Sequence, residues 1–141
     1  MKLKAIDRFF NRAFGLLVRI GFGLKHNHLL EVRGRKSGRI YSTPVNVLER
    51  DGARYIVAPR GYTQWVRNVL SNGEASLVKG RRREKIRLQP VAKEKAEILK
   101  AYLDRYKLTV QRYFPVPAGS PAEMFEPLAE QYPVFEVKAS E

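Results

Sequence analysis

The sequence predicts an α+β fold, in which mostly antiparallel strands form a small barrel and three or four helices pack outside it. Runs of strand-forming residues in the middle of the chain are separated by short turn sequences, which is the spacing of hairpins. Amphipathic helical patterns stand before and after these runs. No Gly-x-Gly-x-x-Gly motif follows a strand, which disfavours a parallel dinucleotide-binding sheet.

The chain has 141 residues, enough for one continuous core and too few for two ordinary domains. We therefore expect a single domain over 1–141. The sequence contains no cysteine and two histidines, His26 and His28. Disulfides, thiolate chemistry and cysteine-based metal sites are thereby excluded, and we expect no metal. Both histidines are expected to precede the first strand in a surface or hinge role.

The N-terminal segment, 1–22, predicts an amphipathic helix. Its apolar residues recur at three- and four-residue spacing over 3–20, opposite a face of lysine and arginine. Asp7, Arg8, Asn11 and Arg12 interrupt it, so it is not a secretory signal, and it is too charged to span a bilayer. Packing on its own domain is the first interpretation, and lying on an anionic membrane surface is the alternative.

The first predicted strands, 29–32 and 40–47, flank a turn, and Asp51-Gly52 predicts a tight hairpin into a strand over 54–58. A short helix is expected from Thr63, as N-cap, to Leu70. A hairpin follows, with arms at 75–78 and 85–91 around Gly80-Arg81-Arg82-Arg83. We expect a helix over 93–106, a short helix from Ser120 or Pro121, and a closing strand over 133–137.

Positive charge is concentrated in the first two-thirds of the chain. Residues 1–90 carry 20 Lys and Arg against 6 Asp and Glu, whereas residues 91–141 carry 7 against 8. A charge needed only for solubility would be spread evenly. The asymmetry indicates an anionic partner, which could be nucleic acid, an anionic membrane or a polyanionic small molecule.

The turn Gly34-Arg35-Lys36-Ser37-Gly38-Arg39 gathers cations and a hydroxyl between two glycines. Such a turn can offer backbone N–H groups, the serine hydroxyl and fixed cations to one anion, and a phosphate fits this set of donors. The motif alone is equally typical of a solvated basic turn.

The order of motifs resembles the deazaflavin (F420)-dependent nitroreductase family, within the flavin/deazaflavin oxidoreductase superfamily of split β-barrels. The resemblance rests on Gly34-Arg35-Lys36-Ser37-Gly38, Thr43-Pro44-Val45, Asp51-Gly52, the run from Val57 to Gly61, and Trp65 with Asn68. It covers about 29–92, and the closing strand near 132–137 also fits. It implies a split-barrel fold in which 29–92 binds the cofactor and 93–141 adds helices and the closing strand.

The resemblance implies a site for coenzyme F420, a deazaflavin that carries a phosphodiester and an oligoglutamate tail, with FMN or FAD as alternatives. By this resemblance the turn would hold the phosphate and tail, and strand and loop residues would surround the ring. The implied cofactor-binding residues are Arg35, Lys36, Ser37, Gly38, Thr43, Pro44, Val45, Ala58, Pro59, Arg60, Gly61, Trp65, Arg67 and Asn68.

The loop at 59–64 departs from the family pattern. Many members have Lys-Gly-Gly and then a His-Pro pair before the tryptophan, whereas this chain has a shorter loop without histidine. Arg60 replaces the lysine with a planar guanidinium, so the geometry of the contact differs.

The implied activity is hydride transfer from the reduced deazaflavin to a quinone-like, nitroaromatic or other conjugated acceptor, a small apolar molecule. Without histidine or cysteine in the motif, the candidate proton donors are tyrosines and serines. The tyrosines singled out are Tyr62, Tyr113 and Tyr132, each of which is also typical of packing. Phe114 and Phe125 are candidates for an acceptor pocket, with core packing as the default.

Two other functions stay open at the level of sequence. The same barrel could carry a flavin or fatty acid without turnover, and Arg81-Arg82-Arg83 could contact nucleic acid, although no nucleic-acid-binding signature is present and none is expected as a partner. We expect a cytoplasmic monomer or homodimer, located peripherally on the inner face of the membrane if the N-terminal helix binds lipid.

Overall fold

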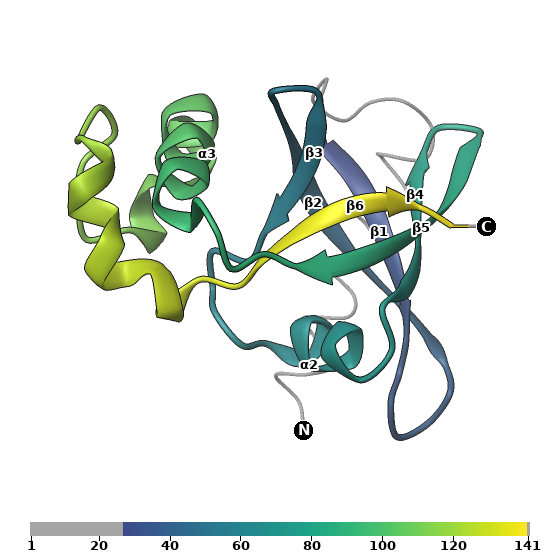
Figure 1. Cartoon of the computed structure of the whole chain (residues 1–141). Helices are drawn as coiled ribbons and strands as arrows, with labels where there is room; N and C mark the ends of the chain where they lie inside the picture. The colour runs from purple at the N-terminus through teal and green to yellow at the C-terminus, as the bar shows by residue number, and fades with distance from the viewer. Residues whose placement is uncertain (1–26, 141) are drawn as a thin grey trace.

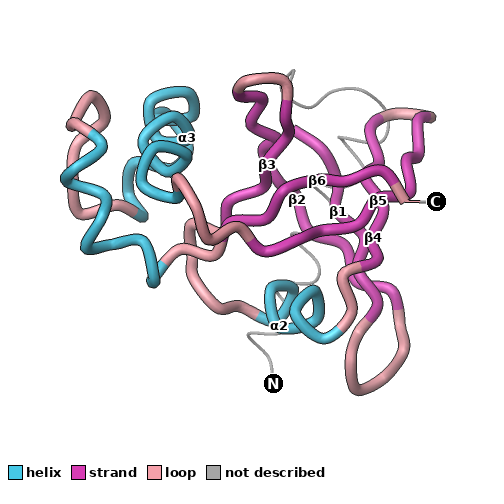
Figure 2. The backbone as a smooth tube through the Cα atoms, in the orientation of Figure 1, coloured by secondary structure: helices cyan, strands magenta, loops and turns pink. Residues whose placement is uncertain are grey.

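A computed structural model describes residues 27–140, and in it six antiparallel strands close into a barrel (Figures 1 and 2). Around the barrel the order is β1-β2-β3-β6-β5-β4, so the last strand of the chain lies between β3 and β5. The strands are β1 (Asn27–Arg33), β2 (Ile40–Arg50), β3 (Ala53–Val57), β4 (Glu74–Lys79), β5 (Arg82–Pro90) and β6 (Val134–Ala139). The predicted α+β barrel is therefore confirmed.

The helices occupy two places outside the barrel. The short helix α2 (Gln64–Ser71) lies across one end, and α3 (Lys95–Val110) lies against one side. Two 3-10 helices, η1 (Gln111–Tyr113) and η2 (Ala122–Gln131), complete the layer that contains α3. In Figure 1 that layer is on the left, and the β1–β2 turn projects at the lower right beside α2.

The β2–β3 hairpin turns at Asp51-Gly52, as the sequence predicts. Both residues have positive φ, 52° and 79°. Two consecutive left-handed residues define the hairpin turn whose twist matches that of the flanking strands, and Asp-Gly is a favoured pair for it. This turn sets the register in which Val47 lies opposite Ile56.

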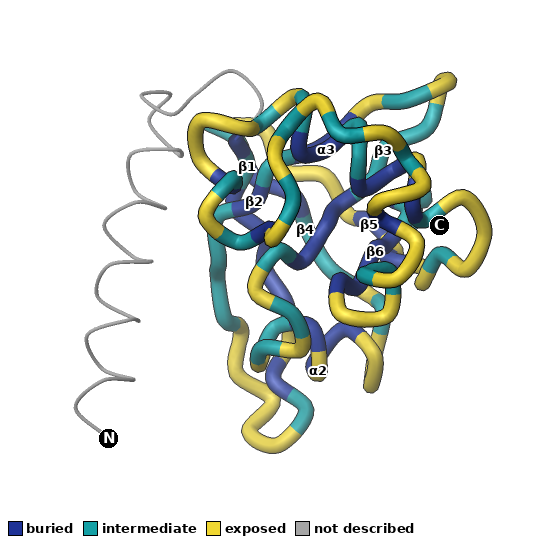
Figure 3. The backbone as a smooth tube through the Cα atoms, turned by 90° about the vertical axis from the view of Figure 1, so that its left-hand side faces the viewer, coloured by how far each residue is buried: buried dark blue, intermediate teal, exposed yellow. Residues whose placement is uncertain are grey.

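The barrel interior holds the first of two cores, made of alternate residues from the strands and of one face of α2. Figure 3 shows the burial along the strands and the exposure of the turns that join them. The interior side chains include Leu30, Val32, Val45, Val47, Ile56, Val66, Val69, Leu77, Ile86, Leu88 and Phe135. Ile86 and Leu88 alternate with exposed residues on β5, which confirms the predicted pattern of that strand.

The second core lies between the outer face of the barrel and the helical layer. Ile56 points into the barrel while its neighbour Val57 packs in this second cluster, as the alternation of a strand requires. Phe114, Phe125 and Tyr132 are buried there, so the default expectation of core packing holds for both phenylalanines. The hydroxyl of Tyr106 donates a hydrogen bond of 2.6 Å to the Val47 carbonyl and joins α3 to β2.

Several predicted boundaries are corrected by the structure. His28 lies within β1, opposite Val45, and not before the first strand. The helix predicted to end at residue 106 continues to Val110 beyond a kink at Tyr106 (φ −113°, ψ 26°). The turn between β4 and β5 is shorter than expected, because Arg82 and Arg83 already belong to β5. The helix expected from Ser120 or Pro121 begins at Ala122 and is a 3-10 helix. The predicted N-terminal helix, with its membrane alternative, and His26 lie outside the described residues.

Candidate cofactor site

The β1–β2 turn, residues 34–39, is closed by its own backbone. The Gly34 N–H donates to the Arg39 carbonyl at 2.6 Å, and the Gly38 N–H donates to the Gly34 carbonyl at 2.9 Å. Gly38 has a φ of 75°, which favours glycine. Gly34 is packed so closely that a Cβ would lie 2.6 Å from the Tyr41 ring. The two glycines that bracket the motif therefore have separate roles, conformation at 38 and space at 34.

Hydrogen bonds fix this turn to α2. The side chain of Arg35 donates from Nη1 to Asn68 Oδ1 at 2.8 Å and to Gln64 Oε1 at 3.0 Å. The backbone N–H of Arg35 also donates to Asn68 Oδ1, at 3.1 Å. Arg35 and Asn68, both predicted site residues, are thus brought together across 33 positions of sequence.

The tip of the turn presents cations and backbone donors to the surface. Lys36, Ser37, Gly38 and Arg39 are all exposed. Ser37 Oγ accepts from the Arg39 N–H at 3.2 Å and lies 3.3 Å from the Tyr41 hydroxyl. Within residues 27–140, the N–H groups of Lys36 and Ser37 and the Lys36 ammonium bond to no other group. These donors are available to an anion.

Every charged side chain in the two described stretches that form this end, 33–48 and 58–73, is cationic, and we call this region the cationic end of the barrel. Its members are Arg33, Arg35, Lys36, Arg39, Arg60 and Arg67. No Asp or Glu occurs in 33–48 or in 58–73, the two stretches that build this end. Six positive charges without a counter-charge in those stretches create a field that attracts a polyanion.

The loop before α2 is ordered by backbone contacts. Ala58 is buried and its N–H donates to the Pro133 carbonyl, while Gly61 has a φ of 82°. Arg67 donates from Nε to the Tyr62 carbonyl at 3.2 Å, so this loop is tied to the helix that follows. Thr63 occupies the N-cap position, as predicted, but makes no side-chain cap, and its buried hydroxyl has no partner in the described chain. Pro59 is half-buried and Arg60 is exposed.

Strand β2 places its three predicted residues differently. Val45 is buried in the barrel interior, whereas Thr43 and Pro44 are half-buried. Thr43 lies opposite Leu30 and Pro44 opposite Leu29. The Val45 side chain therefore supports the strand from inside, and Thr43 and Pro44 are the members of this group with exposed surface.

The three candidate tyrosines lie in two environments. Tyr62 is 52% exposed in the loop before α2, beside the cationic end. Tyr132 is buried in the second core, stacks on Phe114 at 4.5 Å between ring centroids, and donates its hydroxyl to the Tyr113 carbonyl. Burial raises the pKa of Tyr132 above its ordinary value. Tyr62 belongs to the loop before α2, whereas Tyr113 and Tyr132 belong to the helical layer. The two regions meet near Tyr132, because a Cβ on Gly61 would lie 3.4 Å from the Gln131 carbonyl oxygen.

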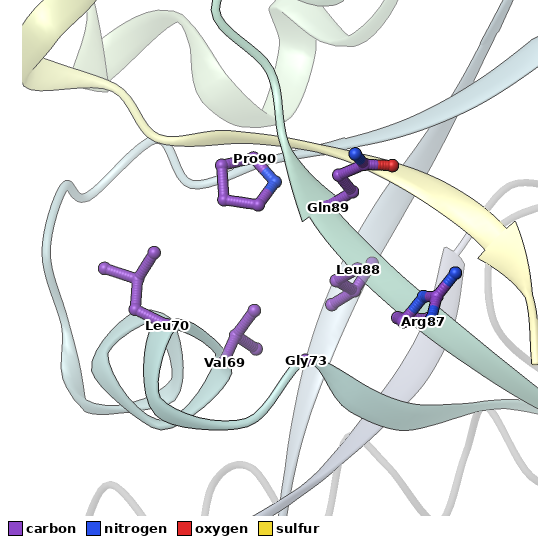
Figure 4. Close-up of a pocket in the computed structure, with 7 residues that line it drawn as sticks. All are labelled: Val69, Leu70, Gly73, Arg87, Leu88, Gln89 and Pro90. Carbon is purple, nitrogen blue, oxygen red and sulfur yellow. The ribbon is translucent and has the colours of Figure 1, made fainter.

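A shallow cavity of about 330 Å³ lies between α2 and β5 (Figure 4). Its lining is Val69, Leu70, Gly73, Arg87, Leu88, Gln89 and Pro90. None of the predicted cofactor-binding residues is among them. The candidate site is accordingly the surface formed by the turn, the loop at 58–63 and α2.

A family model described as F420H(2)-dependent quinone reductase matches residues 6–116 of the sequence. The chain belongs to this family. It is therefore an oxidoreductase, and its cofactor is coenzyme F420. A search of curated proteins finds no match.

Several solved structures have a fold similar to that of this F420H(2)-dependent quinone reductase family member. An F420-H2 dependent reductase, FDR-A, has a TM-score of 0.55 and 21% identity, over 81% of this chain and 95% of that one. Atu2129 from Agrobacterium tumefaciens has a TM-score of 0.61 and 16% identity over 92% of this chain, which spans only 55% of that protein. A domain-swapped dimer has a TM-score of 0.56 and 18% identity, over 98% of this chain and 100% of that one. At these identities the structures show the fold.

The donors at the turn fit the anionic part of F420. A phosphodiester and an oligoglutamate tail need several cations and N–H donors in one exposed place, and the cationic end provides both. The sequence did not reveal Gln64, whose role depends on its tertiary contact with Arg35. Across residues 27–140, no helix is long and apolar enough to cross a membrane.

Proposed function

We propose that this family member transfers hydride from reduced F420 to a conjugated apolar acceptor of the quinone or nitroaromatic type. The observation that carries the proposal is the cationic end, where a turn with free donors is fixed to a helix. The family match identifies the cofactor, and the acceptor class is inferred from the same family.

Lys36, Arg39 and the N–H groups of Lys36 and Ser37 would bind the phosphodiester and the first glutamates of the tail. Charge-assisted hydrogen bonds of this kind are about twice as strong as neutral ones. The guanidinium groups of Arg60 and Arg67 extend the positive field along the loop and α2. The cofactor would therefore be oriented from its anionic end.

The ring would lie along the half-buried residues Thr43, Pro44, Pro59 and Gly61, next to the cationic end. When bound in its reduced form, F420 supplies a hydride from C5 of the deazaflavin. The acceptor takes two electrons with that hydride and needs one proton. Tyr62, exposed in the same loop, would be the proton donor.

Three exposed apolar side chains belong to the segments that form or adjoin the candidate site: Ile40, Tyr62 and Leu70, exposed by 54%, 52% and 51%. They come from the start of β2, the loop before α2 and the end of α2. Exposed apolar surface next to a cofactor site suits an apolar acceptor.

The test is an anaerobic assay in which reduced F420 is mixed with menadione, a nitroaromatic compound or no acceptor, with and without the protein. The proposal predicts protein-dependent oxidation of F420 that requires an acceptor. Binding of F420 without acceptor-dependent oxidation would contradict the acceptor class and favour a carrier. Parallel titrations with FMN and FAD test the selectivity for F420.

Light scattering measures the oligomeric state, because one solved structure of similar fold is a domain-swapped dimer.

A further inference from the structure

One nitrogen of the Arg35 guanidinium, Nη1, is already hydrogen-bonded within the protein. Nη1 of a guanidinium carries two hydrogens, and here both are donated, one to Gln64 Oε1 and one to Asn68 Oδ1. The backbone N–H of the same residue is donated to Asn68 as well. Arg35 therefore behaves as a strut between the turn and α2.

Asn68 is built into the fold at the other end of this strut. Its exposed fraction is 5%, and it is one of three buried polar residues in the described part of the chain. A buried amide oxygen needs a partner, and the two donors of Arg35 supply it. A side chain buried to this extent has little surface with which to contact a cofactor.

Lys36 and Arg39 differ from Arg35 in this respect. Both are exposed, and neither side chain has a hydrogen-bond or ion-pair partner in 27–140. The turn thus divides its cations into one that holds the backbone in place and two that face solvent.

We propose that Asn68 and Gln64 are positioning residues: through Arg35 they fix the β1–β2 turn so that Lys36, Arg39 and the free N–H groups meet the anionic part of the cofactor. This inference rests on the proposed function for the identity of the ligand. It reassigns Asn68 from cofactor contact to support, and it adds Gln64.

The first test needs no cofactor and measures amide hydrogen exchange in the whole protein. In Asn68→Leu, which keeps the side-chain volume but removes the acceptor, exchange at Arg35 should become roughly tenfold faster or more. Asn68→Asp keeps Oδ1 and should retain the protection. Lys36→Ala, which removes a solvent-facing cation, should leave exchange at Arg35 unchanged. Unchanged exchange in Asn68→Leu would overturn the inference.

Urea unfolding decides whether a variant is folded. If Asn68→Leu does not fold, Gln64→Ala serves instead, because Gln64 is exposed and its loss removes only one of the three bonds. A smaller but measurable acceleration of exchange at Arg35 is expected. Unchanged exchange would count against a positioning role for Gln64.

The second test is a double-mutant cycle on the dissociation constant for F420. Arg35→Ala and Asn68→Leu should each weaken binding by about tenfold, and the double variant should be within about threefold of the weaker single variant. Multiplication of the two effects, to about a hundredfold, would mean that Asn68 acts on the cofactor independently. If the wild type binds no F420, the proposed function fails. The exchange measurements alone then decide whether Asn68 and Gln64 fix the turn through Arg35.

Discussion

The ring of Trp65 lies 5.9 Å from that of Phe135, between centroids, at an interplanar angle of 55°. Trp65 belongs to α2 and Phe135 to the strand that closes the barrel. The helix that holds the β1–β2 turn is therefore itself anchored on the barrel core, and the position of the candidate site depends on interior packing.

Replacement of Trp65 by alanine should lower the free energy of unfolding by about 2 to 3 kcal/mol, since the ring is only partly buried and full burial would give more. Urea unfolding measures this loss. Trp65→Phe, which keeps an aromatic partner for Phe135, should lose less than half as much. Equal losses in the two variants would show that the ring contact contributes little.

Gly38→Ala should destabilise the protein by about 1 kcal/mol, because alanine at a φ of 75° is strained while its Cβ meets nothing within 4 Å. Gly38→Asn should lose less, because asparagine tolerates this conformation. The same unfolding measurement applies. A loss in Gly38→Asn that equals or exceeds that in Gly38→Ala would contradict the conformational explanation.

Stability should fall at high pH because of buried tyrosines. Burial raises the pKa of Tyr102, whose hydroxyl bonds to Asn46, and it also raises the pKa of Tyr132. Above the ordinary tyrosine pKa of about 10 the unfolded chain releases these protons and the folded chain keeps them, so the contribution present below pH 10 is lost as the pH rises. A tyrosine that ionises only in the unfolded chain contributes a slope of at most about 1.4 kcal/mol per pH unit.

Urea unfolding between pH 9 and 11 measures this slope, an interval set around the ordinary pKa of about 10. Tyr102→Phe should make it shallower. Identical slopes in wild type and Tyr102→Phe would contradict the assignment.

The three candidate proton donors are separated by phenylalanine variants. Tyr62→Phe should lower kcat by about tenfold or more while the dissociation constant for F420 stays unchanged, the pattern of a lost proton donor. Tyr113→Phe should leave kcat unaltered. Tyr132→Phe should mainly reduce stability, because its hydroxyl bonds to the Tyr113 carbonyl. Stopped-flow oxidation of reduced F420 supplies kcat, and an unaffected kcat in Tyr62→Phe would point to solvent as the proton source.

The barrel was predictable because its signals are local. Alternation on β5 and the Asp51-Gly52 turn depend on neighbouring residues only. The end of α3 was missed because Leu108 is 95% exposed, so the apolar stripe stops at Tyr106 although Val110 is buried again. The backbone is kinked at Tyr106, and the residues after the kink therefore no longer follow the periodicity of the residues before it.

The candidate site was predictable in composition and not in geometry. The glycines and cations of the turn are contiguous in the sequence. The resemblance to a family indicated which ligand they would bind. The hydrogen bonds that hold the turn join Arg35 to Asn68, 33 positions away. No sequence pattern marked Gln64 as a partner of Arg35. Which cation supports the turn and which faces solvent is decided by tertiary contacts.

The most direct test of the cationic end as the cofactor site is a fluorescence titration of F420 with wild type, Lys36→Ala and Arg81→Ala at two salt concentrations. Arg81 is an exposed cation in the β4–β5 turn and controls for the loss of one positive charge. If the cationic end binds the cofactor, wild type should bind tightly and more weakly as salt rises. Lys36→Ala should bind roughly tenfold more weakly with reduced salt dependence, and Arg81→Ala should bind like wild type. Equal affinity in all three proteins, or binding that is indifferent to salt, would contradict the assignment of the cationic end as the cofactor site.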